Sequence, residues 1–426
     1  MKVGLFTVCS TLAKQDEIGK RVAIEVSSLL GEIKGDLKVS ELITSANAAE
    51  EIAKGLRDEI SGAIVAVATG GTERSIRAIA TNLGKPILIL ANPFNNSLAS
   101  SQEVYAILRE QGLTAKLFYS PLDSSIIDSV KAFVQVCKAI QKLEDCRLGQ
   151  VGGPSPWILT SKDEDPIKRR IGPELIRLEV AELLDLVKKV DPNEAEELAE
   201  KLKDKFGEVV EPLEEDMVNA AKVYLAMKEL ASKYNLTAIT IRCFDLIEHN
   251  LTGCIGMSIF NDLGIVAGCE ADLDAMLTMM IVSFLTDEPC WMANVVRVDK
   301  DANTVTLAHC TIATKMLADV KKSALRSHFE SNKCAGIQGP LRDVDVTIAR
   351  LGGKELGKMI IADGKIIKSD MQDPGLCRTQ VEIRLNGNVE DFLENSLGNH
   401  QILAYGNLAG LLADFCQFKG IEQIII

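Results

Sequence analysis

Two carboxylates stand two residues apart in the segment Gly268-Cys269-Glu270-Ala271-Asp272, directly after an apolar run at 263–267. An apolar helix is predicted to follow them at 273–285, so both acids are expected to be largely buried. A buried carboxylate is costly unless it is paired or bound to a cation. The pair therefore suggests oxygen ligands for a divalent ion. The alternative is structural, with Asp272 capping the helix and Glu270 in a salt bridge.

Histidine is the second residue type that could take part, and the chain holds only four. His309 ends the β-type run TVTLAHC, and His400 follows a glycine–asparagine turn in LGNHQILAYGN, which we read as following a helical segment. His328 is predicted to lie on a polar surface helix, and His249 near the end of a strand. Two carboxylates with one or two imidazoles suit Mn²⁺, Co²⁺ or Mg²⁺ better than a thiolate-rich zinc site.

A glycine-rich turn, Thr69-Gly70-Gly71-Thr72, separates a predicted strand from a helix that opens at Glu73. Glycines let a ligand approach the backbone, and the start of a helix is electropositive. The alternative is an ordinary turn with Thr72 as N-cap. The turn matches neither the dinucleotide nor the P-loop pattern. Because Cys-Ser-Thr follows the first strand in place of a glycine motif, a nucleotide-dependent oxidoreductase is disfavoured.

The elements that must position these residues fall into three parts. Residues 1–150 alternate short apolar runs with helical periods, which predicts a parallel sheet covered by helices. Glycine and proline at 151–156 suggest a boundary, after which 151–264 form a second, helix-rich α/β unit. From 265 to 426 strand patterns dominate, except for helices at 273–285 and 404–418. The predicted fold is α/β: two Rossmann-like α/β domains followed by a mainly β, barrel-like C-terminal domain.

The composition limits the class of partner. The 426 residues carry a net charge of −13, which argues against nucleic acid as the main partner. Eleven cysteines without a CxxC pair are typical of free thiols in a reducing cytoplasm. No apolar stretch is long enough to predict a membrane span, and the N-terminal run is read as a strand rather than a signal peptide. We therefore expect a cytoplasmic protein that acts on a small molecule.

Three segments resemble motifs of the L-fucose/L-arabinose isomerase family, and they occur in the same order. VATGGTERS is similar to the family's NGTERPG-type segment, GCEADLDAML to its ATEND-type segment, and GNHQILAYGN to its ANHG-type segment. The β-rich end also resembles the family's C-terminal barrel domain. The resemblance implies a metal-dependent aldose–ketose isomerase of a pentose, hexose or deoxyhexose.

The resemblance also assigns residues. Asp272 and His400 match metal ligands, and Glu270 is an acid in the same motif. His309 is a further candidate, as a fourth ligand or as a hydrogen-bond donor to the sugar. Glu248 lies in the interval where the family has a second catalytic glutamate. Three more residues are assigned to substrate binding, the first two reaching a neighbouring subunit's site: Thr72, Glu73 and Asn399.

The implied reaction passes through an enediol. A divalent cation, most simply Mn²⁺ with Co²⁺ or Mg²⁺ possible, would bind the sugar oxygens, and Glu270 or Glu248 would move the proton. The resemblance further implies a homo-oligomer, a trimer or hexamer. Two alternatives stay open: a sugar-binding protein of the same fold without chemistry, and an isomerase of a modified or anionic sugar. An anionic substrate would need a basic pocket, for which Arg74, Arg77 and Arg242 are candidates.

Overall fold

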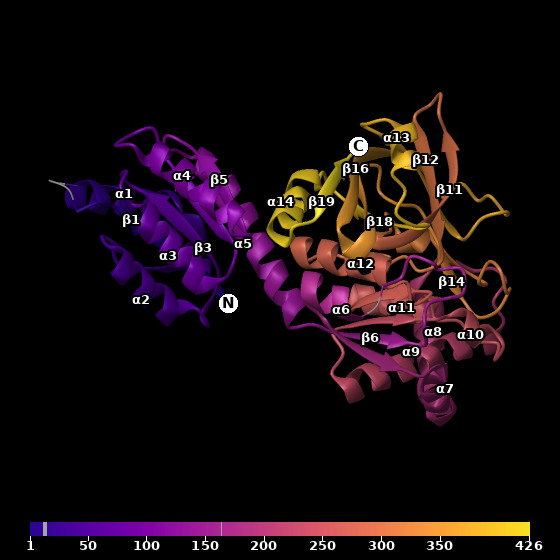
Figure 1. Ribbon diagram of the computed structural model, residues 1–426. Helices are drawn as coiled ribbons and strands as arrows, with labels where there is room; N and C mark the ends of the chain where they lie inside the picture. Colours follow the sequence, from indigo (N-terminus) through magenta and orange to yellow (C-terminus); the bar gives the residue numbers. More distant parts are fainter. Residues whose placement is uncertain (12–14, 163) are drawn as a thin grey trace. The chain divides into compact units, whose positions relative to one another are not determined.

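The computed structural model describes residues 1–11, 15–162 and 164–426. They form two compact units: Met1–Lys142 with Ala413–Gly420, and Leu143–Leu412 with Ile421–Ile426 (Figure 1). The fold is mixed α/β, with two parallel sheets and a closed antiparallel barrel, as predicted. Among the described residues, no helix is long and apolar enough to cross a membrane.

The first unit is built on a five-stranded parallel sheet in the order β2-β1-β3-β4-β5. Because β1 has β2 on one side and β3 on the other, the winding reverses there, and the crevice at the carboxyl ends of β1 and β3 is where such folds bind ligands. The predicted start of the first helix, at Ala13, lies outside the described residues. The elements are β1 Lys2–Val8, α1 Gln15–Leu29, η1 Gly31–Asp36, β2 Leu37–Val39, α2 Ala46–Leu56, β3 Ile60–Val67, α3 Glu73–Leu83, β4 Ile87–Ala91, α4 Ser97–Glu110, β5 Ala115–Tyr119, α5 Ser125–Glu144 and, from later in the chain, α14 Ala409–Lys419.

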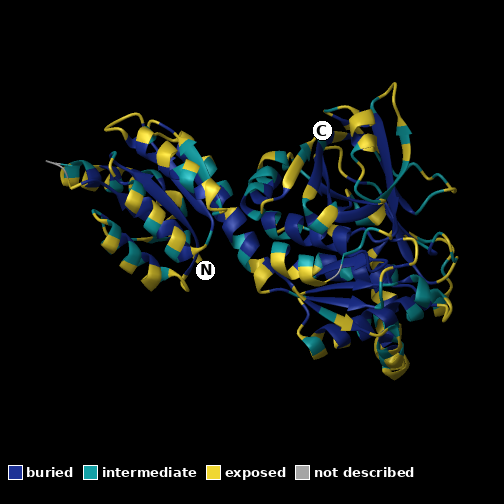
Figure 2. Cartoon of the chain, viewed as in Figure 1, coloured by how far each residue is buried: buried dark blue, intermediate teal, exposed yellow. Residues whose placement is uncertain are grey.

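The second unit opens with a four-stranded parallel sheet in the order β10-β9-β6-β7. The strand β6, predicted to lie before the domain boundary, pairs with β7 and β9 of this sheet. The strands β6, β9 and β10 are buried almost along their whole length, the edge strand β7 is only partly buried, and the helices alternate buried and exposed faces (Figure 2). The elements are β6 Arg147–Val151, α6 Glu164–Pro166, the π-helical turn η2 Ile167–Ile171, β7 Glu174–Leu178, α7 Val180–Lys189, α8 Pro192–Lys205, α9 Glu214–Tyr234, β9 Ala238–Ile241, α10 Phe244–Ile247, α11 Cys254–Asp262, β10 Val266–Cys269 and α12 Leu273–Thr286.

The same unit continues into a six-stranded antiparallel barrel, which closes because β15 pairs with both β18 and β16. Alternate inward side chains such as Val305, Leu307 and Ile348 fill its core. The barrel strands are β11 Trp291–Asp299, β12 Thr304–His309, β15 Asp345–Gly352, β16 Lys358–Ser369, β17 Thr379–Leu385 and β18 His400–Tyr405, with β19 Glu422–Ile425 added to β16.

Short elements connect the barrel strands: η3 Thr314–Met316, η4 Val320–Lys322, η5 Lys354–Leu356 and α13 Val389–Glu394. A small sheet in the order β14-β13-β8 (Gly336–Gln338, Ala324–Arg326 and Glu208–Val209) lies outside the barrel.

Two local predictions were wrong. The helix predicted at 404–418 starts only at Ala409, because 400–405 form β18 and Gly406, at φ +98°, ends that strand. His328 lies on no helix: it follows β13 in a loop and is buried, with its Nδ1 3.0 Å from Ser331 Oγ. In the first case strand pairing with β11 and β15 overrides the local pattern, and in the second the burial of His328 does so.

Candidate active site

The acid-bearing loop between β10 and α12 has an unusual backbone. Glu270 and Ala271 are consecutive non-glycine residues in the left-handed region, at φ +60° and +51°. Such conformations are costly for residues with a Cβ, and they cluster at functional sites. Asp272 then returns to extended φ/ψ and caps α12, its Oδ1 accepting from the Ala275 N–H at 3.1 Å. The loop therefore holds Glu270 in a fixed position next to a helix start.

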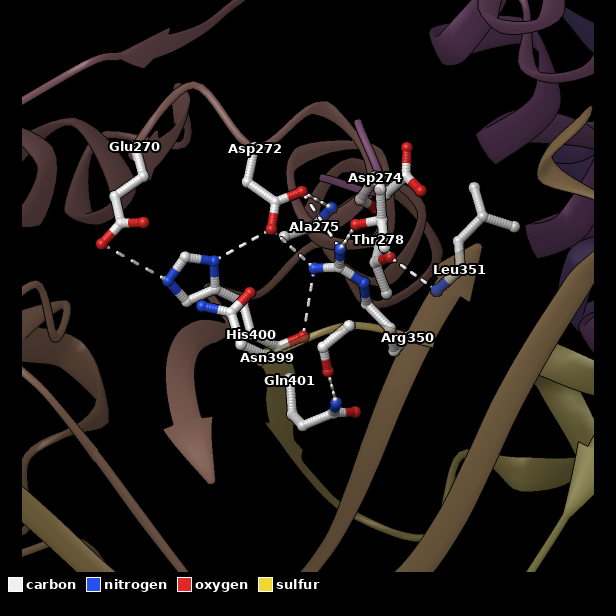
Figure 3. A network of polar contacts seen from close by, with 12 residues as sticks. Glu270, Asp272, Asp274, Ala275, Thr278, Arg350, Leu351, Asn399, His400 and Gln401 are labelled. Atoms are coloured by element: carbon white, nitrogen blue, oxygen red, sulfur yellow. Dashed lines mark hydrogen bonds and ion pairs between the residues drawn. The ribbon is translucent and has the colours of Figure 1, made fainter. Parts of the chain in front are cut away.

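Asp272 is the centre of a fully buried polar network (Figure 3). Arg350, from β15, donates to both of its oxygens at 2.9 and 3.1 Å, and His400, from β18, lies with Nδ1 2.9 Å from Oδ2. Burial alone would raise the pKa of Asp272, but the Arg350 charge and the His400 contact outweigh it and hold the pKa well below its usual range. Asp272 is therefore a carboxylate that accepts from both partners.

This carboxylate fixes the tautomer of His400. Since ionised Asp272 can only accept, His400 Nδ1 must carry the proton in their hydrogen bond. Nε2 is the ring nitrogen that Asp272 does not engage. It is buried, has no hydrogen-bond partner among the described residues, and lies 4.0 Å from Glu270 Oε1. A histidine held by a carboxylate at one nitrogen and free at the other is the usual arrangement of a metal-ligating imidazole.

Aromatic rings surround Glu270 on its other side. Trp157 donates its indole N–H to Glu270 Oε2 at 2.6 Å. Its ring meets Phe244 edge-on at 4.8 Å, and Phe244 meets His328 at 6.1 Å. His309 lies with its ring 5.7 Å from that of His400. Glu270 therefore sits in a partly apolar enclosure in which charge interactions are stronger than in water.

The two further imidazoles of this enclosure are neutral. Burial holds the pKa of His309 well below its usual value. Burial and the nearby Arg378 charge lower the pKa of His328 to about 4. His309 Nδ1 lies 2.9 Å from Thr311 Oγ1, which leaves the other ring nitrogen for a ligand. At neutral pH, His309 can therefore exchange hydrogen bonds with a sugar hydroxyl without adding charge.

The loop after β6 contacts Glu270, Asp274 and Arg350, the partner of Asp272. Its Trp157 holds Glu270, and Thr160 Oγ1 accepts from Arg350 at 3.3 Å. Lys162 lies 3.0 Å from Asp274, whose pKa burial raises to about 6. Segment 152–162 therefore ties the barrel side of the site to the parallel sheet.

The site lies at the switch point of the second sheet. Because β6 has β7 on one side and β9 on the other, the crevice opens at the carboxyl ends of β6 and β9. Arg242 follows β9 and packs against Gly152, where a Cβ would meet its side chain at 3.1 Å. Its guanidinium is committed to Asp245, at 2.6 and 2.8 Å.

Four of the predicted site residues lie close together in the structure, and the other predicted site residues lie elsewhere. Four lie together in the second unit: Glu270, Asp272, His309 and His400. Glu248 is exposed at the end of α10, and among the described residues no hydrogen bond or ion pair joins it to those four. Asn399 precedes His400 but is exposed, its amide donating to Asn294 at 3.3 Å.

The predicted substrate-binding turn belongs to the first unit and lies at its switch point. Thr72 is buried, with Oγ1 donating to the Thr69 carbonyl at 3.0 Å and 3.0 Å from Ser100 Oγ. It occupies the N-cap position of α3 without a capping hydrogen bond from its side chain, and Glu73 begins the helix. Arg74 and Arg77 are exposed on α3.

Sequence reasoning missed Arg350, Trp157 and Lys162. The only signal for Arg350 was a guanidinium at the end of an otherwise apolar run, VTIAR. Trp157 and Lys162 lie in a loop whose partners are more than a hundred residues away.

The site offers two donors for a divalent cation, the Glu270 carboxylate and His400 Nε2. Among the described residues, no three histidine, cysteine or carboxylate groups are already arranged around one point. Glu270 and His400 Nε2 are candidate ligands at 4.0 Å: two donors about 2 Å from a shared ion lie roughly 3–3.5 Å apart when adjacent and about 4 Å apart when opposed, so the pair would bind an ion from opposite sides or close by about half an ångström. Both oxygens of Asp272 are already engaged, which suits a group that orients His400.

Comparison with known proteins gives relatives but no family model that matches. The chain is 22% identical over 339 residues to a sulfoquinovose isomerase of Priestia aryabhattai, covering 77% of this chain and 75% of the relative. Sulfoquinovose isomerases of Clostridium sp. (strain MSTE9) and Alkalicoccus urumqiensis are 21% and 22% identical, covering 77% and 74% of this chain and 75% and 72% of the relatives. The chain is therefore similar to sugar isomerases over about three quarters of its length.

Proposed function

We propose that this protein is an aldose–ketose isomerase of a small anionic sugar, with a divalent cation held by Glu270 and His400. The observation that carries the proposal is His400, whose Nδ1 is fixed by Asp272 while its buried, unpartnered Nε2 faces Glu270. The similarity to sulfoquinovose isomerases supports both the reaction and the charge of the substrate, because sulfoquinovose is a six-carbon sugar that carries a sulfonate.

The chain's own residues would act on an open-chain sugar in the enclosure around Glu270. A bound divalent cation, Mn²⁺ in the first instance, supplies Lewis acidity that polarises the carbonyl and offsets developing negative charge. Glu270 would take the proton from C2 and return it to C1, while the proton of the C2 hydroxyl passes to the C1 oxygen, so that the aldehyde becomes a hydroxyl and the C2 hydroxyl becomes the ketone. Glu270 Oε1 would hold the cation with His400, so Oε2, whose position is fixed by the Trp157 indole N–H, is the oxygen that would move the proton. Neutral His309 holds a sugar hydroxyl. Acid–base help of this kind contributes about 10²–10⁴-fold.

The roles assigned to Asp272 and Glu248 change accordingly. Asp272 orients His400 and is a positioning residue in this proposal rather than a ligand. Glu248, exposed and unconnected to the other acids, takes no part in the proton transfer. The assembly into a trimer or hexamer, with Thr72 and Glu73 serving a neighbouring site, stays a prediction from the resemblance.

The test combines metal content with turnover. Elemental analysis of the purified protein would be paired with assays of ketose formation from sulfoquinovose, glucose 6-phosphate and neutral aldoses, before and after chelation. We expect turnover of an anionic sugar that is lost with EDTA and restored by Mn²⁺, Co²⁺ or Mg²⁺. Glu270→Gln and His400→Ala should each abolish it.

Two outcomes would contradict this. Full activity after complete chelation would remove the cation from the proposal. A protein without bound metal and without turnover of any sugar would be a binding protein of the same fold.

A further inference from the structure

Arg378 is a buried cation without a carboxylate partner. Its side chain is about nine-tenths buried, directly before β17. Nε donates to the Ser327 carbonyl at 2.8 Å and Nη2 to Ser327 Oγ at 3.0 Å, and the Phe329 ring lies 5.8 Å from the guanidinium carbon. Among the described residues no ion pair reaches it. Buried charges are normally paired, as Arg350 is with Asp272, so this site lacks an anion.

The groups around Arg378 do not supply that anion. Glu211 senses its charge, but that carboxylate is bound by Arg326 through Nε and Nη2. His328, next to it, is neutral because its pKa lies at about 4. The hydrogen bond with Cys377, and further the backbone N–H and charge of Arg378, lower the pKa of the Cys310 thiol to about 7, so this thiol supplies at most part of the opposite charge at neutral pH. Among the described residues no carboxylate is left to pair with Arg378.

One edge of the guanidinium is open. Nη1 makes no hydrogen bond within the described parts of the chain, and it is not one of the enclosed polar atoms that lack a partner. It therefore reaches accessible space. With Ser327 Oγ beside Nη2, this edge offers donors in the planar arrangement that binds the oxygens of a tetrahedral anion.

The open edge belongs to the same enclosure as Glu270. Thr379, the residue after Arg378, pairs in register with His309. The segment 327–330 carries the contact further, because the His328 ring lies 6.1 Å from that of Phe244, and Phe244 meets Trp157, the hydrogen-bond donor to Glu270, at 4.8 Å. Arg378, bound to Ser327, is thus linked to the surroundings of Glu270 through His328 and these rings.

We propose that Arg378, with Ser327 and the uncharged His328, forms the subsite for a sulfonate or phosphate at the end of the sugar remote from Glu270 and His400. This rests on the isomerase function proposed above. A single positive charge matches a sulfonate monoanion better than a phosphate dianion. Arg242, the sequence-predicted candidate, is less suited because Asp245 already neutralises it.

The test compares Arg378→Gln and Arg378→Lys with a matched control, Arg342→Gln, which removes an exposed guanidinium stacked on Tyr405 at the far end of β18. Substrates are sulfoquinovose, glucose 6-phosphate and 6-deoxyglucose, the neutral counterpart. We expect Arg378→Gln to lower kcat/KM for sulfoquinovose about 100-fold and Arg378→Lys about 10-fold. Turnover of 6-deoxyglucose, and all activity of Arg342→Gln, should stay within about twofold. A larger loss with glucose 6-phosphate than with sulfoquinovose would identify phosphate as the anion.

A second measurement does not depend on turnover. Methanesulfonate should raise the thermal midpoint of the wild type but not of Arg378→Gln, and it should inhibit turnover of sulfoquinovose competitively. If methanesulfonate binds through Arg378 while no sugar is isomerised, the subsite stands and the isomerase proposal fails. If folded Arg378→Lys and Arg378→Gln turn over sulfoquinovose as the wild type does, the subsite is wrong and the isomerase stands. Should Arg378→Gln not fold, the lysine variant and the wild-type inhibition pattern decide.

Discussion

At the scale of single residues, Glu270 and Asp272 have the same chemistry and opposite surroundings. Glu270 faces a free imidazole nitrogen and an indole, whereas Asp272 is enclosed by Arg350 and His400 with no accessible surface. The first can change partners when a ligand arrives. The second cannot do so without leaving a buried guanidinium unpaired, a cost of about 3–5 kcal/mol.

Neutralising substitutions of the two acids should therefore have different effects: one on cation binding, the other on stability. Glu270→Gln should abolish cation binding and activity while the unfolding free energy changes by less than about 1 kcal/mol, because Gln still accepts from Trp157. Asp272→Asn should lose about 3–5 kcal/mol, since Asn keeps the helix cap but not the charge. Urea unfolding and Mn²⁺ titration of both variants separate the roles. Loss of Mn²⁺ binding at unchanged stability in Asp272→Asn would instead identify Asp272 as a ligand.

His328 should make the protein acid-sensitive. Burial, and next the Arg378 charge, lower its folded-state pKa from 6.5 to about 4, so the unfolded chain takes up its proton first. The stability from this group is present above pH 6.5 and is lost as the pH falls from 6.5 to about 4. His328→Gln should flatten the fall of the urea midpoint in that window. His249→Gln, at an exposed histidine, should leave the fall unchanged. Equal pH profiles for all three proteins would contradict the assignment.

The motif resemblance, rather than strand order, indicated which acids and imidazoles belong together, because Glu270 and Asp272 follow β10 of the parallel sheet whereas His309 ends β12 of the barrel. The sequence could not predict Arg350, whose partner is 78 residues away in the chain and depends on the register of β15 with β18. Nor could it show that Asp272 faces inward to His400 rather than toward a ligand, since that orientation is set by the same ion pair.

At the scale of elements, the approach of β15 to the turn before β18 depends on one glycine. A Cβ at Gly398 would lie 2.6 Å from Arg350 Nη2 and 2.9 Å from Cζ. No rotamer change of Arg350 relieves this while both hydrogen bonds to Asp272 persist. The Arg350–Asp272 ion pair therefore requires glycine in the turn before β18.

Gly398→Ala should displace Arg350, destabilise the protein by about 2–4 kcal/mol and reduce activity through His400. The matched control is Gly410→Ala in α14, where a Cβ meets nothing within 4 Å and a small gain from helix propensity is expected. Thermal unfolding and kcat/KM of both variants check this. Equal stability of the two alanine variants would show that the turn before β18 can accommodate a Cβ without loss of unfolding free energy.

Helices and strands could be predicted where the pattern of apolar residues extends over a long enough segment. The helix at 73–83, the strands of the first sheet and β9 of the second sheet follow from apolar patterns, whereas β7 falls in a stretch that reads as helix-rich. β18 was not predictable, because a six-residue run between a turn and a helix reads equally as either. Its identity as a strand comes from pairing with β11 and β15, which lie far away in the sequence.

At the scale of the whole molecule, two separate segments of the chain make up the first unit. Residues 413–420 return to it, where Asp414 lies 2.6 Å from Lys116 and the Phe418 ring packs 5.4 Å from that of Phe133. β19 then rejoins the second unit by pairing with β16. The two units are thus linked by covalent continuity in both directions.

Phe418→Ala should loosen the first unit while the metal-binding residues of the second unit are unaffected. Removing a buried phenylalanine costs about 3–5 kcal/mol. Hydrogen exchange read by mass spectrometry should show faster exchange in residues 15–142 and little change around 266–286. Leu393→Ala, at an exposed side chain, is the control. Uniformly faster exchange in both units would mean that they unfold as one.

The return of residues 413–420 has a consequence for synthesis. During translation the N-terminal sheet is complete early, but the helix carrying Phe418 leaves the ribosome only after the entire 143–412 segment. At about 5–20 residues per second, the wait is on the order of tens of seconds. For that time the nascent sheet exposes the apolar face around Phe133 that α14 later covers, a face that chaperones would be able to recognise.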